Sequence, residues 1–235
     1  MTMEILSLRN NLLALSFVLF TSLISGVLTA CSPGTTENSN NTGEISDCTN
    51  CSAGDNRQQV NHTDVNHDMD LGPTDTNYNL RFIDGMILHH QGAVEMAKEV
   101  QQKSQRPELK QLADAIITDQ NQEIGQMQQW RTAWYPNAKD EPMAYHSKMG
   151  HMMEMTPEQK QSMMMSVDLG AADSKFDLRF INAMIPHHEG AVVMAKDALE
   201  KSQRSEMKKL AQEIIKAQEA EIKQMKQWRQ AWYNQ

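Results

Sequence analysis

The stretch LRFIDGMILHHQGAVEMAK at residues 80–98 decides the fold, and it returns as LRFINAMIPHHEGAVVMAK at residues 178–196. The repeat extends well beyond these two stretches. Residues 70–135 align without a gap with residues 168–233, at an offset of 98, and about 39 of the 66 positions are identical. Such identity at one fixed offset indicates an internal duplication. The chain therefore carries two copies of one structural unit.

Each copy has the pattern of a helical hairpin. Asp75 and its copy Asp173 stand just ahead of an apolar periodic run, where a helix N-cap is expected. Residues 104–107 should break the first helix, and Pro107 suits the first turn of the next one. No run of alternating β-branched residues predicts a strand. The positions that recur with helical spacing on one face of the first helix are Phe82, Ile83, Met86, Ile87, His90, Ala93, Val94 and Ala97.

Two hairpins supply four helices, enough to close an all-α, four-helix bundle around one core. We predict one bundle domain, built from hairpin repeat 1 at residues 70–135 and hairpin repeat 2 at residues 168–235. A connection at residues 136–167 joins the repeats. Residues 31–69 are rich in small polar residues and poor in large apolar ones, so we expect a flexible tether there.

Residues 1–30 have the features of an export signal. Arg9 precedes an apolar run at residues 12–20 that is short for a membrane span. The signal closes on Leu-Thr-Ala-Cys, which resembles a bacterial lipobox, so Cys31 is the expected lipidation site. Ser32 rather than Asp follows, which favours the outer membrane. The alternative is an ordinary signal peptide with a chance cysteine. We expect an extracytoplasmic protein, held by lipid on the periplasmic side of a bacterial membrane.

The remaining charges and cysteines narrow the classes of partner. The net charge of −8, without basic runs, argues against nucleic acid as a partner. Cys48 and Cys51 form a C-x-x-C, which in an oxidising compartment is a disulfide, a metal clip or a redox pair. No βαβ pattern surrounds the pair, and we expect a disulfide within the tether.

The duplicated stretch also concentrates nitrogen and sulfur donors. Met86, His89 and His90 are three and four residues apart, so they share one helix surface, and Met96 lies two turns further along. The second copy repeats the set as Met184, His187, His188 and Met194. A buried imidazole needs partners for both ring nitrogens, and a metal ion is one such partner.

The second helix of each hairpin offers an alternative to the metal. Gln120 and Glu123, with their copies Gln218 and Glu221, interrupt its apolar stripe shortly before Met127 and Met225. The histidines would then be core residues hydrogen-bonded to these side chains, with the methionines as adaptable packing. Because two adjacent histidines and a methionine occur in both copies, the pattern favours a metal.

The connection at residues 136–167 is long for a bundle, where 2–8 residues are typical. It holds eight of the sixteen methionines outside the signal, with His146 and His151 among them. Five soft donors lie within seven residues: Met149, His151, Met152, Met153 and Met155. Interleaved histidines have no packing purpose, so copper binding is favoured here. The alternative is an amphipathic segment that covers the bundle or docks a partner protein.

The type of donor indicates the metal. Thioether sulfur with imidazole suits copper, above all Cu(I), whereas hard ions prefer oxygen ligands and zinc rarely uses thioether. We predict a non-catalytic protein that sequesters Cu(I), or also Cu(II), or delivers it to an exchange partner. The predicted copper ligands are Met86, His89, His90, Met96, Met127, His146, Met149, His151, Met152, Met153, Met155, Met184, His187, His188, Met194 and Met225.

The string DLRFINAMIPHHEGAVVMA at residues 177–195 resembles the signature of the family catalogued as domain of unknown function 305. The resemblance covers residues 70–235 and implies a ferritin-like helical fold. It also implies a role in copper resistance, because the family includes a cyanobacterial periplasmic copper-binding protein. The second copy matches the signature better. In the first copy Asn79 replaces the Asp and Leu88 replaces the Pro, so a weaker or differently shaped site is expected there.

A ferritin-like fold raises the competing possibility of a di-iron or di-manganese oxidase. Such sites need paired Glu-x-x-His motifs on facing helices. The sequence contains no Glu-x-x-His, no H-E-x-x-H, no pattern of a nucleophilic triad and no glycine-rich phosphate loop. We therefore expect that the protein is not an enzyme.

Overall fold

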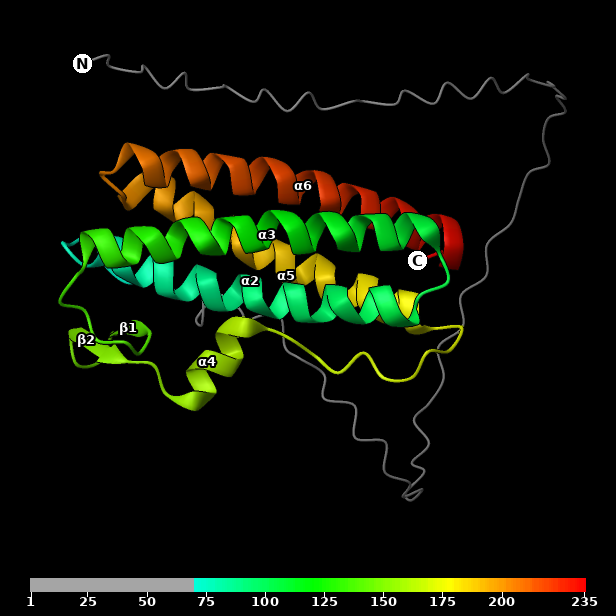
Figure 1. Ribbon diagram of the computed structural model, residues 1–235, viewed down its shortest axis with the longest axis horizontal. Helices are drawn as coiled ribbons and strands as arrows, with labels where there is room; N and C mark the ends of the chain where they lie inside the picture. Colours follow the sequence, from blue (N-terminus) through cyan, green and yellow to red (C-terminus); the bar gives the residue numbers. More distant parts are fainter. Residues whose placement is uncertain (1–69) are drawn as a thin grey trace, which may run out of the picture. The chain divides into compact units, whose positions relative to one another are not determined.

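The computed structural model describes residues 70–235. The predictions for the export signal, for Cys31, for the tether and for Cys48 and Cys51 lie outside these residues. Four long helices make up the described part: α2 (Tyr78–Lys103), α3 (Pro107–Trp134), α5 (Phe176–Lys201) and α6 (Ser205–Tyr233) (Figure 1). Helices α2 and α5 begin and end 98 positions apart, as the duplication predicts. The predicted all-α, four-helix arrangement is confirmed.

Each repeat forms one hairpin, and the two hairpins meet through their first helices. Helix α3 packs along α2, α6 packs along α5, and α2 contacts α5. Helices α2 and α5 run in opposite directions (Figure 1), so equivalent residues of the two repeats approach each other near the middle of the pair. Between residues 70 and 235, no helix has the length and apolar character that crossing a membrane demands.

The predicted N-caps at Asp75 and Asp173 are wrong, because the helices begin after Asn77 and Lys175. Asp75 instead accepts a hydrogen bond from the Asn77 backbone N–H at 2.8 Å and forms an ion pair with Arg81 at 2.9 Å. The Arg81 side chain is buried and also donates to the Leu71 carbonyl at 2.5 Å. A buried guanidinium needs a counter-charge. Arg81 therefore holds Asp75 in the segment before the helix.

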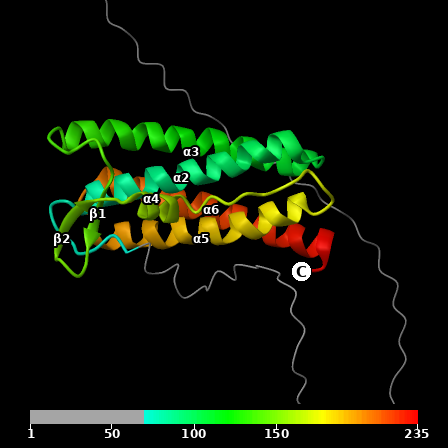
Figure 2. The same cartoon turned by 90° about the horizontal axis from the view of Figure 1, so that it is seen from below.

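The connection is folded, and it contains two short strands that the sequence did not predict. Strand β1 (Met143–His146) pairs antiparallel with β2 (His151–Glu154), and helix α4 (Pro157–Met164) follows. Figure 2 shows the hairpin at the end of the bundle where α2 begins. The strands form without β-branched residues because Tyr145 packs against Gly72 and lies 5.4 Å from the Arg81 guanidinium. Tertiary packing overrides strand propensity here.

Reciprocal arginine–tryptophan contacts hold the two hairpins together. Trp134 and Trp232 each stack on a second tryptophan one turn earlier, with ring centroids 4.9 and 5.1 Å apart. Arg204 of repeat 2 lies 4.0 Å from the Trp134 ring of repeat 1, and Arg106 of repeat 1 lies 4.0 Å from the Trp232 ring. A guanidinium over an indole face is attractive. An arginine of each repeat thus contacts a tryptophan of the other repeat.

Candidate metal centre

The four histidines of the duplicated motif lie together in the core where α2 meets α5. His89, His90 and His188 are fully buried, and His187 is 1% exposed. The rings of His89 and His187 have centroids only 3.9 Å apart, at an interplanar angle of 51°. The sequence suggested one site per repeat. The structure instead builds one joint histidine cluster, because the antiparallel crossing brings the two copies of the motif face to face.

Two of these histidines are held by glutamates from the outer helices. His90 Nε2 lies 2.6 Å from Glu123 Oε2, and His188 Nε2 lies 2.6 Å from Glu221 Oε2. A carboxylate only accepts hydrogen bonds, so each Nε2 donates its hydrogen and Nδ1 is the ring nitrogen left for another partner. Neither Nδ1 has a partner within residues 70–235. A carboxylate that accepts from an imidazole in this way commonly orients a histidine that binds a metal.

The other two histidines also present unpaired nitrogens. His187 Nε2 lies 3.1 Å from the Met164 carbonyl, so it donates there and leaves Nδ1 without a partner. His89 has no partner at either nitrogen among the described residues. Five buried ring nitrogens are therefore unpaired. Each buried unpaired polar group costs about 1–3 kcal/mol, and a bound metal ion would remove that cost for the lone pairs.

Burial also sets the protonation state of His89 and His187. Desolvation, with a smaller effect of the neighbouring His188, lowers the pKa of His187 to about 3. Desolvation and the nearby His187 hold the pKa of His89 well below its usual range. Both imidazoles are therefore neutral at pH 7. Neutral imidazole is the form that binds metals.

The predicted methionine ligands of the long helices lie in the two apolar clusters of the core. Met86, Met127 and Met194 belong to one buried cluster, and Met96, Met184 and Met225 belong to the other. At the offset of 98, Met86 and Met127 correspond to Met184 and Met225, and Met96 corresponds to Met194. Each trio therefore contains residues of both repeats. All six side chains are at most 1% exposed. The structure thus assembles thioethers and imidazoles from both hairpins within one core.

The donors do not yet converge on a point. Within residues 70–235, no three His, Cys, Asp or Glu side chains are placed to hold a metal ion by themselves. An ion at the histidine cluster would need thioether sulfur or a small rotation of the imidazoles. That requirement favours a soft ion over one that demands several nitrogen and oxygen ligands.

Helix α4 closes one side of the cluster. A Cβ added at Gly92 would lie 1.9 Å from the Met164 carbonyl oxygen, so the backbone of the connection rests directly on α2 at this glycine. The same carbonyl accepts the hydrogen bond from His187. Gly92 and the Met164 carbonyl escaped the sequence analysis. A glycine inside a helical pattern was the available signal for a close backbone approach.

Acidic side chains lie beside the histidine–glutamate pairs. Burial, together with Glu221 and Glu123, raises the pKa of Asp119. Glu123 and Glu221 are 18% and 17% exposed, whereas their histidine partners are fully buried. The carboxylates therefore link the buried imidazoles to solvent and create a negative potential that attracts cations. The sequence analysis had identified both glutamates as possible histidine partners.

The donors of the connection separate into two groups, one in the core and one on the β1–β2 hairpin. Met155 is 5% exposed and packs in the core with Met86 and Met127. Met149 and Met153 are 60% and 39% exposed, and they belong to the β1–β2 hairpin with His146, His151 and Met152. The donors of the connection therefore do not form one cluster.

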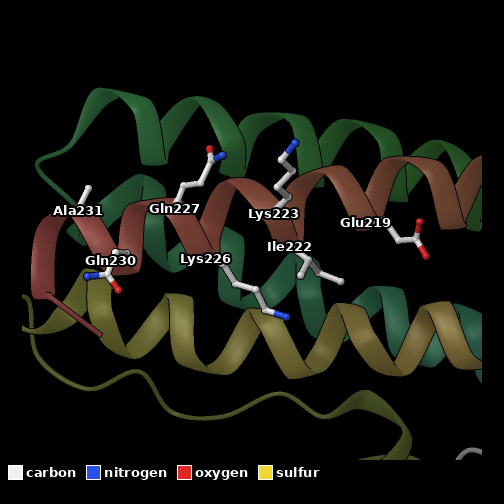
Figure 3. Close-up of a pocket in the computed structure, with 7 residues that line it drawn as sticks. All are labelled: Glu219, Ile222, Lys223, Lys226, Gln227, Gln230 and Ala231. Atoms are coloured by element: carbon white, nitrogen blue, oxygen red, sulfur yellow. The ribbon is translucent and has the colours of Figure 1, made fainter. Parts of the chain in front are cut away.

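An open depression on α6 contains no such donors. Figure 3 shows its lining of polar, charged and small apolar side chains, among them Glu219, Ile222 and Lys226. None of the residues that line it is a histidine or a methionine. The depression therefore has no chemistry in common with the histidine cluster.

Comparisons with known proteins identify relatives of the whole bundle. A family model described as Domain of unknown function (DUF305) matches residues 79–229. The solved structure of CopM in the Cu(II)-bound form is 43% identical, with a TM-score of 0.53, and the match covers 66% of this chain and 97% of CopM. CopM in the Cu(I)-bound form matches at 40% identity and a TM-score of 0.51, with the same coverage.

A more distant relative has the same fold. A DUF305 fragment from Deinococcus radiodurans is 26% identical, with a TM-score of 0.52, and the match covers 66% of this chain and 96% of the fragment. No curated protein matches the sequence.

Proposed function

The chain belongs to the family described as Domain of unknown function (DUF305), and we propose that it binds copper and sequesters or delivers it outside the cytoplasm, without catalysis. The observation that carries the proposal is the cluster of four buried histidines with five unpaired ring nitrogens. The similarity to CopM, which has been solved in Cu(I)-bound and Cu(II)-bound forms, supports copper as the ion.

The donor set favours Cu(I). The Nδ1 atoms of His90, His187 and His188 have no partner among the described residues, and thioethers lie in both apolar clusters of the core. Imidazole and thioether are ligands that suit Cu(I), whereas hard divalent ions prefer carboxylate and water. Glu123 and Glu221 fix two of the imidazoles and increase their basicity. In this proposal they support the ligands and do not bind copper themselves.

Burial of the histidine cluster suits retention of the ion. The histidines are at most 1% exposed, so a chelator in solution has no direct access to them. Release then requires local opening of the bundle or of α4, which is the kind of step that a partner protein could promote. A contribution to copper resistance or homeostasis follows from retention of this kind.

Copper loading tests the proposal. Purified protein should withdraw Cu(I) from a chromophoric chelator, and His187→Ala with His188→Ala should lower the number of ions taken, with helicity checked by circular dichroism. If the wild-type protein withdraws no copper, the proposal fails.

A milder pair of variants separates ligand support from packing. Glu221→Gln removes the carboxylate behind His188 and should weaken Cu(I) binding by roughly 10–100-fold. Glu189→Gln changes an exposed carboxylate on α5 and should leave affinity unchanged. Equal affinities for the two variants would contradict the role assigned to Glu221.

We also propose that the protein is lipid-anchored through Cys31 on the periplasmic side of a bacterial membrane. The cysteine at the end of an export signal supports this assignment. When the full chain is expressed in a bacterium with an outer membrane, it should be recovered in the membrane fraction. Cys31→Ser should move it to the soluble fraction, and recovery of both forms in the same fraction would contradict the anchor.

A further inference from the structure

The β1–β2 hairpin places three soft donors on one of its faces. In its antiparallel register His146 is opposite His151, and Ala144 is opposite Met153. Successive side chains point to opposite faces of a strand, so both histidines and Met153 share a face. Directly opposite residues have Cβ atoms about 4.5–5.5 Å apart, and a diagonal neighbour such as Met153 remains within reach of a long side chain.

This donor face is exposed on β2 and half-buried on β1. Tyr145 and Met152 occupy the other face, and Tyr145 packs toward Gly72 and the Arg81 guanidinium. On the donor face, His151 is exposed and Met153 is 39% exposed. His146 is half-buried, and Ala144 beside it packs against the core. Methionines at such positions contribute little to the core.

Ring nitrogens on this face are free to act as ligands. His146 Nδ1 is buried and has no partner among the described residues. His151 Nδ1 lies 3.1 Å from the Met149 carbonyl, where it donates a hydrogen bond and leaves a lone pair on Nε2. A cavity of about 170 Å³, lined by His146, Met153 and the first turn of α4, lies alongside. It has room for an ion and a few water molecules.

The turn between the strands is defined by its backbone. Gly150 has a φ of +70°, and the His146 carbonyl accepts hydrogen bonds from the Met149 and Gly150 N–H groups at 3.0 and 2.8 Å. These bonds hold Met149, which is 60% exposed, beside the two histidines. Glu154 also lines the cavity, and its carboxylate is paired with Lys139 at 2.6 Å. The imidazoles and thioethers are the donors of this face that carry no such ion pair.

We propose that this face of the hairpin is a second copper site, formed by His146, His151 and Met153 with Met149 from the turn. The site shares no residue with the histidine cluster and depends on the proposed function only for the identity of the ion. Because Met149, His151 and Met153 are exposed while the bundle histidines are buried, copper binds here first and the hairpin acts as the capture site of the protein.

Matched variants of the full chain test the hairpin site. His146→Ala with His151→Ala should lower the Cu(I) stoichiometry by one ion, measured by competition against a chromophoric chelator. Met153→Leu should weaken the binding of that ion by at least roughly tenfold, since even changes to residues that only support a ligand weaken metal sites by 10–100-fold. Met143→Leu changes a methionine of β1 on the opposite face and should leave affinity unchanged.

The outcomes separate the two copper sites. Unchanged stoichiometry in the double-histidine variant, or equal weakening by Met153→Leu and Met143→Leu, overturns the hairpin site. If the His187/His188 variant then still loses copper, the proposed function stands without the hairpin. If the hairpin variant loses one ion and the His187/His188 variant loses none, the hairpin site stands and the assignment of copper to the histidine cluster fails. Far-UV circular dichroism and urea midpoints confirm that each variant is folded.

Discussion

Gly92→Ala tests how firmly the connection is held over the histidine cluster. A Cβ at this position would lie 1.9 Å from the Met164 carbonyl oxygen, well inside the 3.0 Å that real Cβ contacts respect. The obstacle is backbone, so α4 or α2 must move by about 1.1 Å, the difference between these distances. That movement would break the hydrogen bond from His187 to Met164.

Gly125→Ala is the matched control for the magnitude. Both glycines are inside helices, so alanine gains about 1 kcal/mol of helix propensity at either position. Nothing lies within 4 Å of a Cβ at Gly125, and this variant should be more stable than the wild type. At Gly92 overpacking costs about 1–3 kcal/mol and the lost hydrogen bond about 0.5–1.5 kcal/mol. Since propensity cancels in the comparison, the two variants should differ by roughly 1.5–4.5 kcal/mol.

Urea unfolding followed by far-UV circular dichroism measures this difference. The free energies of unfolding of the metal-free variants are compared at one pH, and unchanged slopes confirm that the transition is the same. A Gly92→Ala variant as stable as Gly125→Ala would refute the reasoning, because the carbonyl of Met164 would then not rest on α2.

Three further predictions concern the histidines, the arginine–tryptophan contacts and the methionines. Burial lowers the pKa of His187 to about 3, so below pH ~6.5 the unfolded chain binds a proton at this residue that the folded chain excludes. The free energy of unfolding of the metal-free protein should therefore fall by about 1.4 kcal/mol per pH unit toward pH 3. Urea midpoints measured across pH should show a shallower fall in His187→Ala. Arg106→Ala and Arg204→Ala each remove a guanidinium 4.0 Å from an indole ring. Each should lower the free energy of unfolding by about 0.5–1 kcal/mol and change the tryptophan emission. Unchanged stability would show that these arginine–tryptophan contacts do not hold the hairpins together. Met184→Leu conserves volume in the core and should cost under about 1.5 kcal/mol yet weaken Cu(I) binding, whereas Met207→Leu, equally buried, should leave copper binding unchanged.

Much of the fold was accessible from the sequence because the relevant signals are local. The helix break before Pro107 depends on residues adjacent in the chain, and α2 ends at Lys103 as that break predicts. The start of α2 was wrong by two residues, since Asp75 is drawn to the buried Arg81 guanidinium. The hairpin was missed because its strands are stabilised by Tyr145 against the bundle and not by their own propensity.

The candidate metal centre was accessible only in part. Helical spacing placed His89 and His90 near one surface, but it could not show that the His187 ring would lie 3.9 Å from the His89 ring, centroid to centroid. From the sequence, His90 was expected either to bind a metal or to form a hydrogen bond with a residue such as Glu123 in the core. In the structure the glutamate occupies Nε2 and leaves Nδ1 unpaired, so the two alternatives are compatible.

The sequence by itself determined that two copies of one helical hairpin carry imidazole and thioether donors at fixed spacing, because helix periodicity and duplication are properties of residues near one another in the chain. Only the tertiary structure decided that the two motifs form one buried cluster, that α4 rests on α2 at Gly92, and that Met149, His151 and Met153 of the hairpin are exposed. Those outcomes depend on the antiparallel crossing of α2 and α5 and on the approach of Gly92 to Met164, 72 residues away, and local spacing does not specify such partners.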